Sequence, residues 1–210
     1  IEGRALPSGY PSRLSGKRLG IVVDEASDSI QTGYLRYRIE EEGGSALLVG
    51  RKAGKSLRLS ATPWEWGEFG VRVTTEAALP DPGVITSCDD EAELNSMAVQ
   101  AKELDGLLLP GGLGTWMIRG HPGLHQIIRK MLATGKFIGA VGRGPKLLLS
   151  ARVLEGRRVT CAPQMRDDLL YAGINVEDAP LVRDDNLLTA RDTEALPTFV
   201  KTMLKIMAVS

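Results

Sequence analysis

The stretch from Lys136 to Leu149 has the pattern of a turn that presents one residue for chemistry. An apolar run over 137–141 has the length of a buried strand. A helical pattern follows Gly142-Arg143-Gly144 and starts with Pro145, which suits a first helical turn. Such a nucleophile elbow holds one residue beside the free N–H groups of a helix N-terminus, and enzymes place Ser or Cys there. Here the residue is Gly142, which has no side chain to react.

Two other turns are candidates to meet this elbow. Pro110-Gly111-Gly112 follows one apolar run, and Asp28 follows the first apolar run of the chain. Because the carboxyl ends of parallel strands share one edge of a sheet, we expect these turns to converge with Arg143 on one pocket. The N–H groups of Gly111, Gly112 and Arg143 would then form an anion or oxyanion cradle. Asp28 would be the acid that holds a proton near the elbow.

The cysteines and histidines of the chain are weaker candidates for catalysis or metal binding. Cys88 precedes two aspartates, which disfavour a thiolate. Cys161 lies on a predicted strand, where it either approaches the elbow from the side or, as we favour, packs as a small buried residue. His121 and His125 stand four residues apart, but Pro122 makes His121 a helix cap and no third ligand is near. We therefore expect no metal, and no cofactor either.

Two glycine-rich segments are rejected as nucleotide sites. The segment 50–56 has three residues rather than four before Gly-Lys-Ser, so a solvated basic turn is favoured over a phosphate loop. Gly112-Leu113-Gly114 lacks the third glycine of a dinucleotide fingerprint, because that position is Met117.

The elements that must position the elbow alternate between strand and helix patterns. This alternation predicts an α/β doubly wound sandwich with a mainly parallel sheet. Strands are expected at 18–23, 46–49, 106–109, 137–141 and 158–162, with short ones near Val176, Leu181 and Leu187.

Helical periodicity predicts the covering layers. Helices are expected where Ile30, Tyr34 and Tyr37 mark one face, over 94–101, along Leu124, Ile127, Ile128, Met131 and Leu132, over 168–172, and at the end of the chain, where Leu196, Phe199, Val200, Met203, Leu204 and Met207 would be buried.

The segment 50–87 interrupts this alternation and is interpreted as a β-hairpin and loop excursion from the sheet. Val71–Thr74 alternates like an exposed strand. Trp64, Trp66 and Phe69 form an aromatic cluster, which we expect to pack onto the body or to form a subunit contact.

The composition limits which classes of partner and which cellular compartment are expected. The chain has 210 residues, and its 26 basic and 26 acidic residues give a net charge of zero, which argues against nucleic acid or a membrane surface as main partner. Two cysteines are too few for a disulfide framework and favour a reducing compartment, the cytoplasm. The opening Ile1-Glu2-Gly3-Arg4 matches a protease cleavage site, so 1–16 is interpreted as a tag remnant and arm, and 17–210 as a single domain.

Over residues 17 to 208 the chain resembles the DJ-1/PfpI superfamily, a class I glutamine amidotransferase-like group. The resemblance rests on the runs at 104–112, 135–145, 154–160 and 186–191, in this order and spacing. It implies a flavodoxin-like three-layer sandwich, usually a homodimer. Active members of the family use an elbow cysteine, a glutamate after the first strand and a glycine-rich oxyanion turn, and other members lack the cysteine.

Carried over residue by residue, the oxyanion turn falls on Gly111-Gly112 and the nucleophile on Gly142. The histidine that often follows the nucleophile falls on Arg143. The glutamate position falls on Asp28, with Gln31 as a second candidate that could not act as an acid. Because cations are disfavoured at a helix N-terminus, we expect Arg143 to pair with an acid such as Asp28 or to bind a small anion.

The resemblance implies three functions. The leading hypothesis is a pseudoenzyme of the stress response, a ligand-binding, chaperone-like or assembly domain. The alternative is a cysteine-dependent hydrolase or a glyoxalase- or deglycase-type enzyme in a form without its nucleophile. The third is an accessory domain of a larger protein, such as a large-subunit catalase.

Overall fold

The computed structural model describes residues 12–60, 70–80 and 103–208. Within them the central sheet has seven strands in the order β10-β11-β7-β6-β1-β2-β5. Neighbouring strands are parallel except for the hairpin of β10 with β11. The strands are β1 (Arg18–Val22), β2 (Ser45–Gly50), β5 (Ala77–Ala78), β6 (Gly106–Leu109), β7 (Phe137–Val141), β10 (Leu181–Asp184) and β11 (Leu187–Ala190). The predicted flavodoxin-like α/β sandwich is confirmed.

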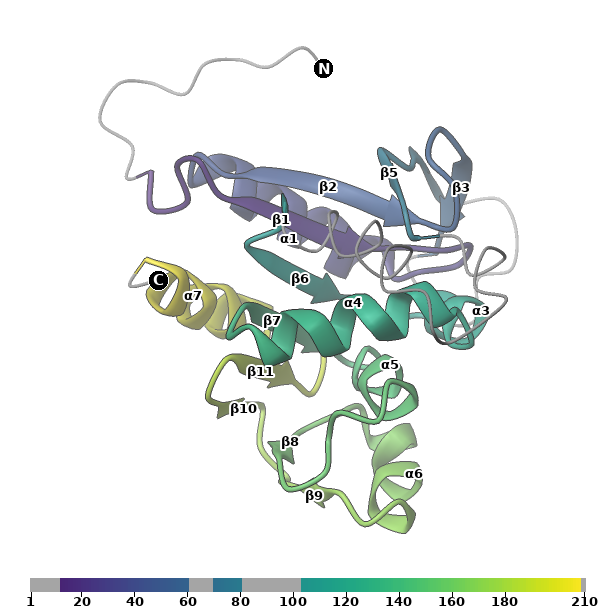
Figure 1. Cartoon of the computed structure of the whole chain (residues 1–210), viewed down its shortest axis with the longest axis vertical. Helices are drawn as coiled ribbons and strands as arrows, with labels where there is room; N and C mark the ends of the chain where they lie inside the picture. The colour runs from purple at the N-terminus through teal and green to yellow at the C-terminus, as the bar shows by residue number, and fades with distance from the viewer. Residues whose placement is uncertain (1–11, 61–69, 81–102, 209–210) are drawn as a thin grey trace, which may run out of the picture.

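Helices cover both faces of this sheet. Helix α1 (Ser29–Glu41) packs beside α7 (Leu196–Met207) on one face, and α4 (Pro122–Ala133) crosses the other in the view of Figure 1. Among the shorter helices, α3 (Gly114–Ile118) lies at one end of α4 in Figure 1, and α5 (Pro145–Ser150) and α6 (Arg166–Tyr171) lie below it in that view. Two apolar clusters, one for each face, form the core.

The long apolar patterns fold as predicted. All six residues expected on the inward face of α7 are buried. Four of the five expected on α4 are buried, and the fifth, Leu132, packs partly buried against the same cluster.

Helix α1 is oriented differently from its apolar pattern. Ile30 and Tyr37 are 51% and 67% exposed, and the buried residues include Leu35 and Gln31. The helix expected there is confirmed, but the face that it buries is the one with Gln31, Thr32, Leu35 and Ile39 rather than the one with Ile30 and Tyr37.

The predicted excursion contains an antiparallel hairpin of β3 (Ser56–Leu59) and β4 (Val71–Thr74), and the chain then returns to the main sheet through β5. The aromatic cluster at 64–69, the helix expected over 94–101 and Cys88 lie outside the described residues.

The strand predicted over 158–162 is shorter than expected. Only β8 (Arg158–Val159) is a strand, and it pairs with β9 (Asn175–Val176) in a separate small sheet. The rest of the predicted strand, residues 160–162, belongs to no β-ladder and runs to the elbow, where Ala162 bonds to Gly142.

Candidate functional site

The turn after β7 has the geometry that an elbow requires. Gly142 has φ of 60°, in the left-handed region that glycine adopts readily. Its N–H donates to the Ala190 carbonyl at 2.9 Å, and the Gly144 N–H donates to the Val141 carbonyl at 2.8 Å. A Cβ on Gly144 would lie 2.0 Å from the Leu109 carbonyl oxygen, so the turn is pressed against β6.

The side chain that faces Gly142 is Gln31, on the first turn of α1. Its Oε1 accepts the Gly111 N–H at 2.7 Å, and its Nε2 donates to Thr193 Oγ1 at 3.1 Å. A Cβ built on Gly142 would lie 3.3 Å from Nε2. Because the Gly111 N–H can only donate, it fixes the amide with its oxygen toward Gly111 and its nitrogen toward Gly142.

Asp28 does not hold the place expected for the acid. Its carboxylate accepts the Gln31 N–H at 2.9 Å and caps the N-terminus of α1. Burial raises the pKa of Asp28, and the hydrogen bonds from the Gln31 and Ile30 N–H groups oppose that shift. Asp28 borders the cavity but its carboxylate is engaged by the helix, so the second candidate, Gln31, is the residue that reaches the elbow.

The expected pairing of Arg143 with Asp28 is absent, and Arg143 forms no ion pair within the described part of the chain. Arg191, the other arginine of the cavity, is compensated. It lies 3.0 Å from Asp192 and 3.5 Å from Asp178. Of the two arginines that line the cavity, Arg143 is therefore the one without an acidic partner among the described side chains.

The predicted cradle is only partly available. Gly111 donates its N–H to Gln31, so this amide is not free for a ligand. Among the residues that the structure covers, the Gly112 and Arg143 N–H groups have no protein acceptor. The donors left for a bound anion are these two amides and the second hydrogen of Gln31 Nε2.

These groups border a cavity of about 320 Å³. The turns after β1, β6, β7 and β11 contribute to it, as expected for the carboxyl end of a doubly wound sheet. The segment Ala162–Gln164 closes one side. Ala162 donates its N–H to the Gly142 carbonyl at 2.8 Å, so this segment is fixed directly to the elbow.

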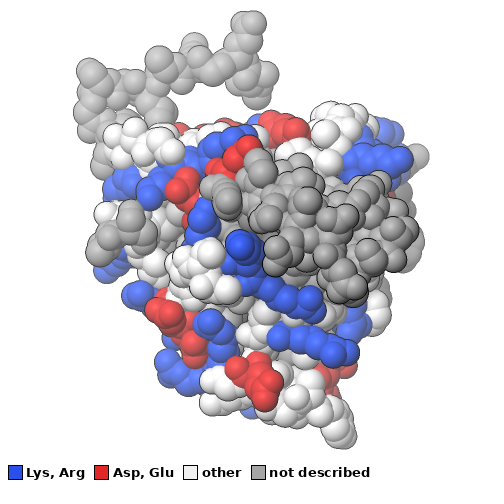
Figure 2. Space-filling model, viewed as in Figure 1, with Lys and Arg blue, Asp and Glu red and all other residues white. Residues whose placement is uncertain are grey.

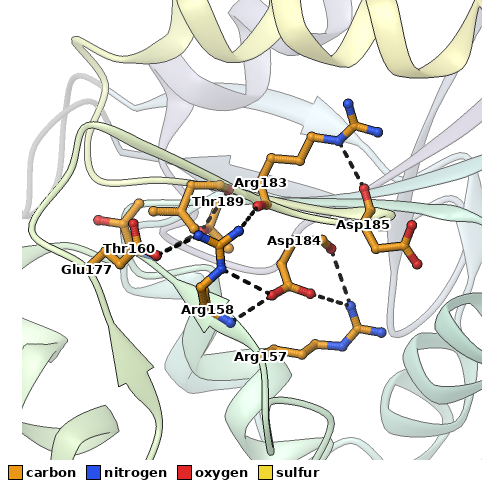
Figure 3. Close-up of polar contacts among 9 residues, drawn as sticks. Arg157, Arg158, Thr160, Glu177, Arg183, Asp184, Asp185 and Thr189 are labelled. Atoms are coloured by element: carbon orange, nitrogen blue, oxygen red, sulfur yellow. Dashed lines mark hydrogen bonds and ion pairs between the residues drawn. The ribbon is translucent and has the colours of Figure 1, made fainter.

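A polar network anchors the start of that segment. Arg157 and Arg158 converge on Asp184, with the Arg158 N–H 3.0 Å from the carboxylate (Figure 3). Thr160 donates its N–H to Thr189 Oγ1 at 2.9 Å and its hydroxyl to the Ala179 carbonyl at 2.7 Å. These bonds replace the ladder bonds that the predicted strand would have made.

Neither Cys161 nor the histidine pair adds chemistry. Cys161 is buried, and burial raises the pKa of its thiol to about 11, so it stays protonated at neutral pH. His125 Nε2 lies 2.7 Å from the Arg119 carbonyl and must donate to it. Within the described residues no group of three potential metal ligands is found. No described helix has the length and apolar character needed to cross a membrane.

Sequence reasoning missed Thr193, Gln164 and Arg191 as lining residues. Arg191 and Thr193 follow the strand expected near Leu187, so its carboxyl end was a usable signal. The spacing of Asp28 and Gln31 was another, since Asp followed three residues later by Gln is a helix N-terminal signature.

Comparison with known proteins gives the same fold. The model of the DJ-1/PfpI family matches residues 18–206. The chain is 36% identical over 195 residues to protein/nucleic acid deglycase 2 of Escherichia coli, covering 92% of this chain and 99% of that protein. It is 30% identical over 190 residues to an uncharacterized protein of Archaeoglobus fulgidus, covering 90% and 98%. Drosophila melanogaster DJ-1beta superposes with a TM-score of 0.72 at 19% identity, covering 94% and 92%.

The chain therefore belongs to the DJ-1/PfpI family.

Proposed function

We propose that this member of the DJ-1/PfpI family is a non-catalytic domain that binds a small anion in the elbow cavity. The observation that carries the proposal is the pair Gly142 and Gln31. The turn keeps the conformation that presents a nucleophile, but it presents a hydrogen atom, with an amide nitrogen 3.3 Å from where a Cβ would stand.

The chemistry of this pair favours binding over catalysis. Gly142 supplies no nucleophile, and an amide cannot exchange a proton as a carboxyl group does. The thiol of Cys161 is buried with a raised pKa, so it does not substitute. What remains around the position of Gly142 is a set of hydrogen-bond donors.

The charges of the cavity select an anion. Asp28 is engaged by the N-terminus of α1 and Asp192 by Arg191, whereas Arg143 has no described partner. An oxygen of a carboxylate or phosphate at the elbow would accept from Gln31 Nε2 and the Arg143 N–H, and its charge would be offset by the Arg143 guanidinium. Hydrogen bonds to charged groups contribute about 1.5–3 kcal/mol each.

Isothermal calorimetry with acetate and with inorganic phosphate tests this function. Arg143→Gln should weaken binding of the better anion about tenfold or more. The matched control is Arg72→Gln, which removes the same charge from the exposed strand β4. Equal affinities of the two variants, or no heat with either anion, would contradict the proposal.

The enzyme alternative is favoured by one observation, the name deglycase carried by several relatives, among them the one 36% identical. In that case the active form has a cysteine at Gly142. The unmodified chain should then still be tested for consumption of reactive aldehydes, and measurable turnover would overturn the non-catalytic proposal. An accessory role in a larger protein is a further possibility for this fold, since one solved relative joins a DJ-1/ThiJ/PfpI-like domain to a ferritin-like domain.

We also propose that the chain is a cytoplasmic homodimer. Support comes from the family resemblance and from exposed apolar side chains that a second copy could cover, among them Ile30 and Tyr37 on α1 and Val71 on β4. Light scattering at micromolar concentration should give twice the chain mass, and a monomer would contradict this assembly.

A further inference from the structure

The net charge of zero conceals two oppositely charged parts of the chain. Between Gly106 and Leu154 there are seven Lys or Arg residues and no Asp or Glu. The remaining 19 basic and 26 acidic residues leave the rest of the chain at −7. The basic part forms β6, α3, α4, β7 and α5. In Figure 2, blue side chains spread over the face of the molecule that α4 crosses in Figure 1.

Three arginines of this part gather at the end of α5. Arg119 donates from Nε to Ser150 Oγ at 2.7 Å, and Arg129 donates from Nε to the Ala151 carbonyl at 2.8 Å. Arg152 is the next residue and is exposed. In the residues that the structure describes, none of the three arginines pairs with a carboxylate.

The two Nε hydrogen bonds hold the guanidinium groups in place but use one N–H of each. The terminal nitrogens keep their donors, and a fixed fork of this kind suits a phosphate group. Because arginines elsewhere in the described chain, such as Arg36 and Arg157, are paired with acids, this cluster differs in having charge left for a partner.

An exposed tryptophan adjoins the arginines. Trp116 is 55% exposed, while the ammonium of Lys146 lies 3.6 Å from its ring centroid and is 3% exposed. The buried ammonium contacts one face of the ring, and more than half of the tryptophan remains exposed. Lys146 is itself held by Asp168 at 3.0 Å, and the Arg119 guanidinium lies 5.7 Å from the ring centroid. The indole is therefore a partly exposed ring that is held beside two cations.

We propose that Trp116, Arg119, Arg129 and Arg152, here named the α5 rim, bind single-stranded nucleic acid. A base would stack on Trp116 and the phosphodiester backbone would run along the three arginines, the combination that single-strand binding surfaces use. The acidic remainder of the chain would repel the same polyanion and restrict it to this face. The expectation that nucleic acid is not a main partner was drawn from the net charge of the whole chain, in which these two oppositely charged parts cancel.

Fluorescence anisotropy with a labelled oligothymidylate of about 12 nucleotides tests the α5 rim. With about three phosphate contacts, raising the salt from about 50 to about 200 mM should weaken binding about 20-fold. Arg129→Gln/Arg152→Gln should weaken binding and flatten this salt dependence. Trp116→Ala should weaken it about fivefold or more at constant salt.

The matched control is Lys201→Gln/Lys205→Gln, which removes the same charge from exposed positions on α7. It should bind like the unmodified chain. Thermal melting of each variant verifies the fold. The proposal is overturned if no binding occurs at the lower salt, or if the control weakens binding as much as the arginine variant. Unchanged binding by Trp116→Ala, with duplex DNA bound equally well, would replace the single-strand assignment by a general polyanion surface.

Discussion

Restoring a side chain at the elbow tests the interpretation of Gly142 most directly. At φ of 60° a Cβ costs about 1–2 kcal/mol relative to glycine, and the stiffer unfolded chain returns about 0.4–1 kcal/mol. The nearest atom to the new Cβ is Gln31 Nε2 at 3.3 Å, at the end of a flexible side chain that can yield by a few tenths of an ångström. Gly142→Cys should therefore destabilise the fold by only about 1 kcal/mol, which lowers Tm by about 2–4 °C.

Substitutions at two other glycines separate the backbone cost of a positive φ from the steric cost of the new Cβ. Gly173 has φ of 76° with nothing within 4 Å of its Cβ position, so Gly173→Ala measures the backbone term alone. Gly144→Ala would place its Cβ 2.0 Å from the Leu109 carbonyl and should cost at least about 3 kcal/mol. Thermal melting of Gly142→Ala should fall close to Gly173→Ala and far from Gly144→Ala.

The new thiol has its own expected behaviour. Beside Gln31 Nε2 and the Arg143 N–H, its pKa should fall below the ordinary value of about 8.5. Alkylation rate against pH, in a Cys88→Ser background, measures it, and Cys161 contributes little below its pKa of about 11. A Gly142→Cys form that melts higher than the parent chain and whose thiol titrates normally would refute the elbow interpretation.

Three further outcomes are expected. Gln31→Leu should cost about 1–3 kcal/mol in urea unfolding, because the buried Gly111 N–H loses its acceptor, and a neutral result would contradict the role given to that bond. Burial raises the pKa of Asp28 above 3.8, so the folded chain binds this proton more tightly than the unfolded chain and loses stability as the pH rises through the folded pKa. Relative to Asp28→Asn, the unmodified chain should therefore be more stable at pH below about 4 than at neutral pH. The opposite sign would be incompatible with the raised pKa. The Cys161 thiol should resist alkylation until the pH nears about 11. Because the unfolded chain loses this proton at lower pH than the folded chain, the fold should lose stability as the pH rises from about 9 toward that value. Rapid labelling at neutral pH would contradict the burial of this thiol.

The fold was predictable where one physical effect dominates. β6 and β7 are buried on both faces, so each reads as a continuous apolar run, and α7 has one clear apolar stripe. The buried face of α1 was not predictable in this way, because polar Gln31 and Thr32 lie on it and Gln31 bonds to the site rather than packing in the core. The strand prediction for the segment after β8 was wrong for a related reason. Hydrogen bonds that involve the side chains of Thr189 and Asp184 hold this segment, where a strand would be held by backbone ladder bonds.

The location of the candidate site could be predicted from the sequence, but the side-chain contacts within it could not. Parallel topology brings the turns at Asp28, Gly111 and Gly142 to one edge of the sheet, and the cavity lies there. Which side chain of α1 reaches the elbow depends on where the helix begins. Since Asp28 is the N-cap, the residue three positions later points at Gly111, and a shift of the helix start by one residue would have changed that choice.

The residues at this elbow are consistent with one another under the proposed function. If Gly142 alone departed from the family pattern, a carboxyl group should still face it, ready to act on a restored thiol. Instead the residue that faces it is Gln31, whose amide is fixed by Gly111 with its donor toward the turn, and the neighbouring position holds Arg143. Under the proposed function, a hydrogen atom, an amide donor and an arginine thus stand where the family resemblance implies a nucleophile, a carboxyl group and a histidine. Each replacement disfavours covalent chemistry, and all three favour an acceptor atom with negative charge at the place where a sulfur would stand. Gly142→Cys is therefore expected to give a reactive thiol without turnover, because Gln31, the side chain nearest to the new Cβ, cannot exchange a proton as a carboxyl group does.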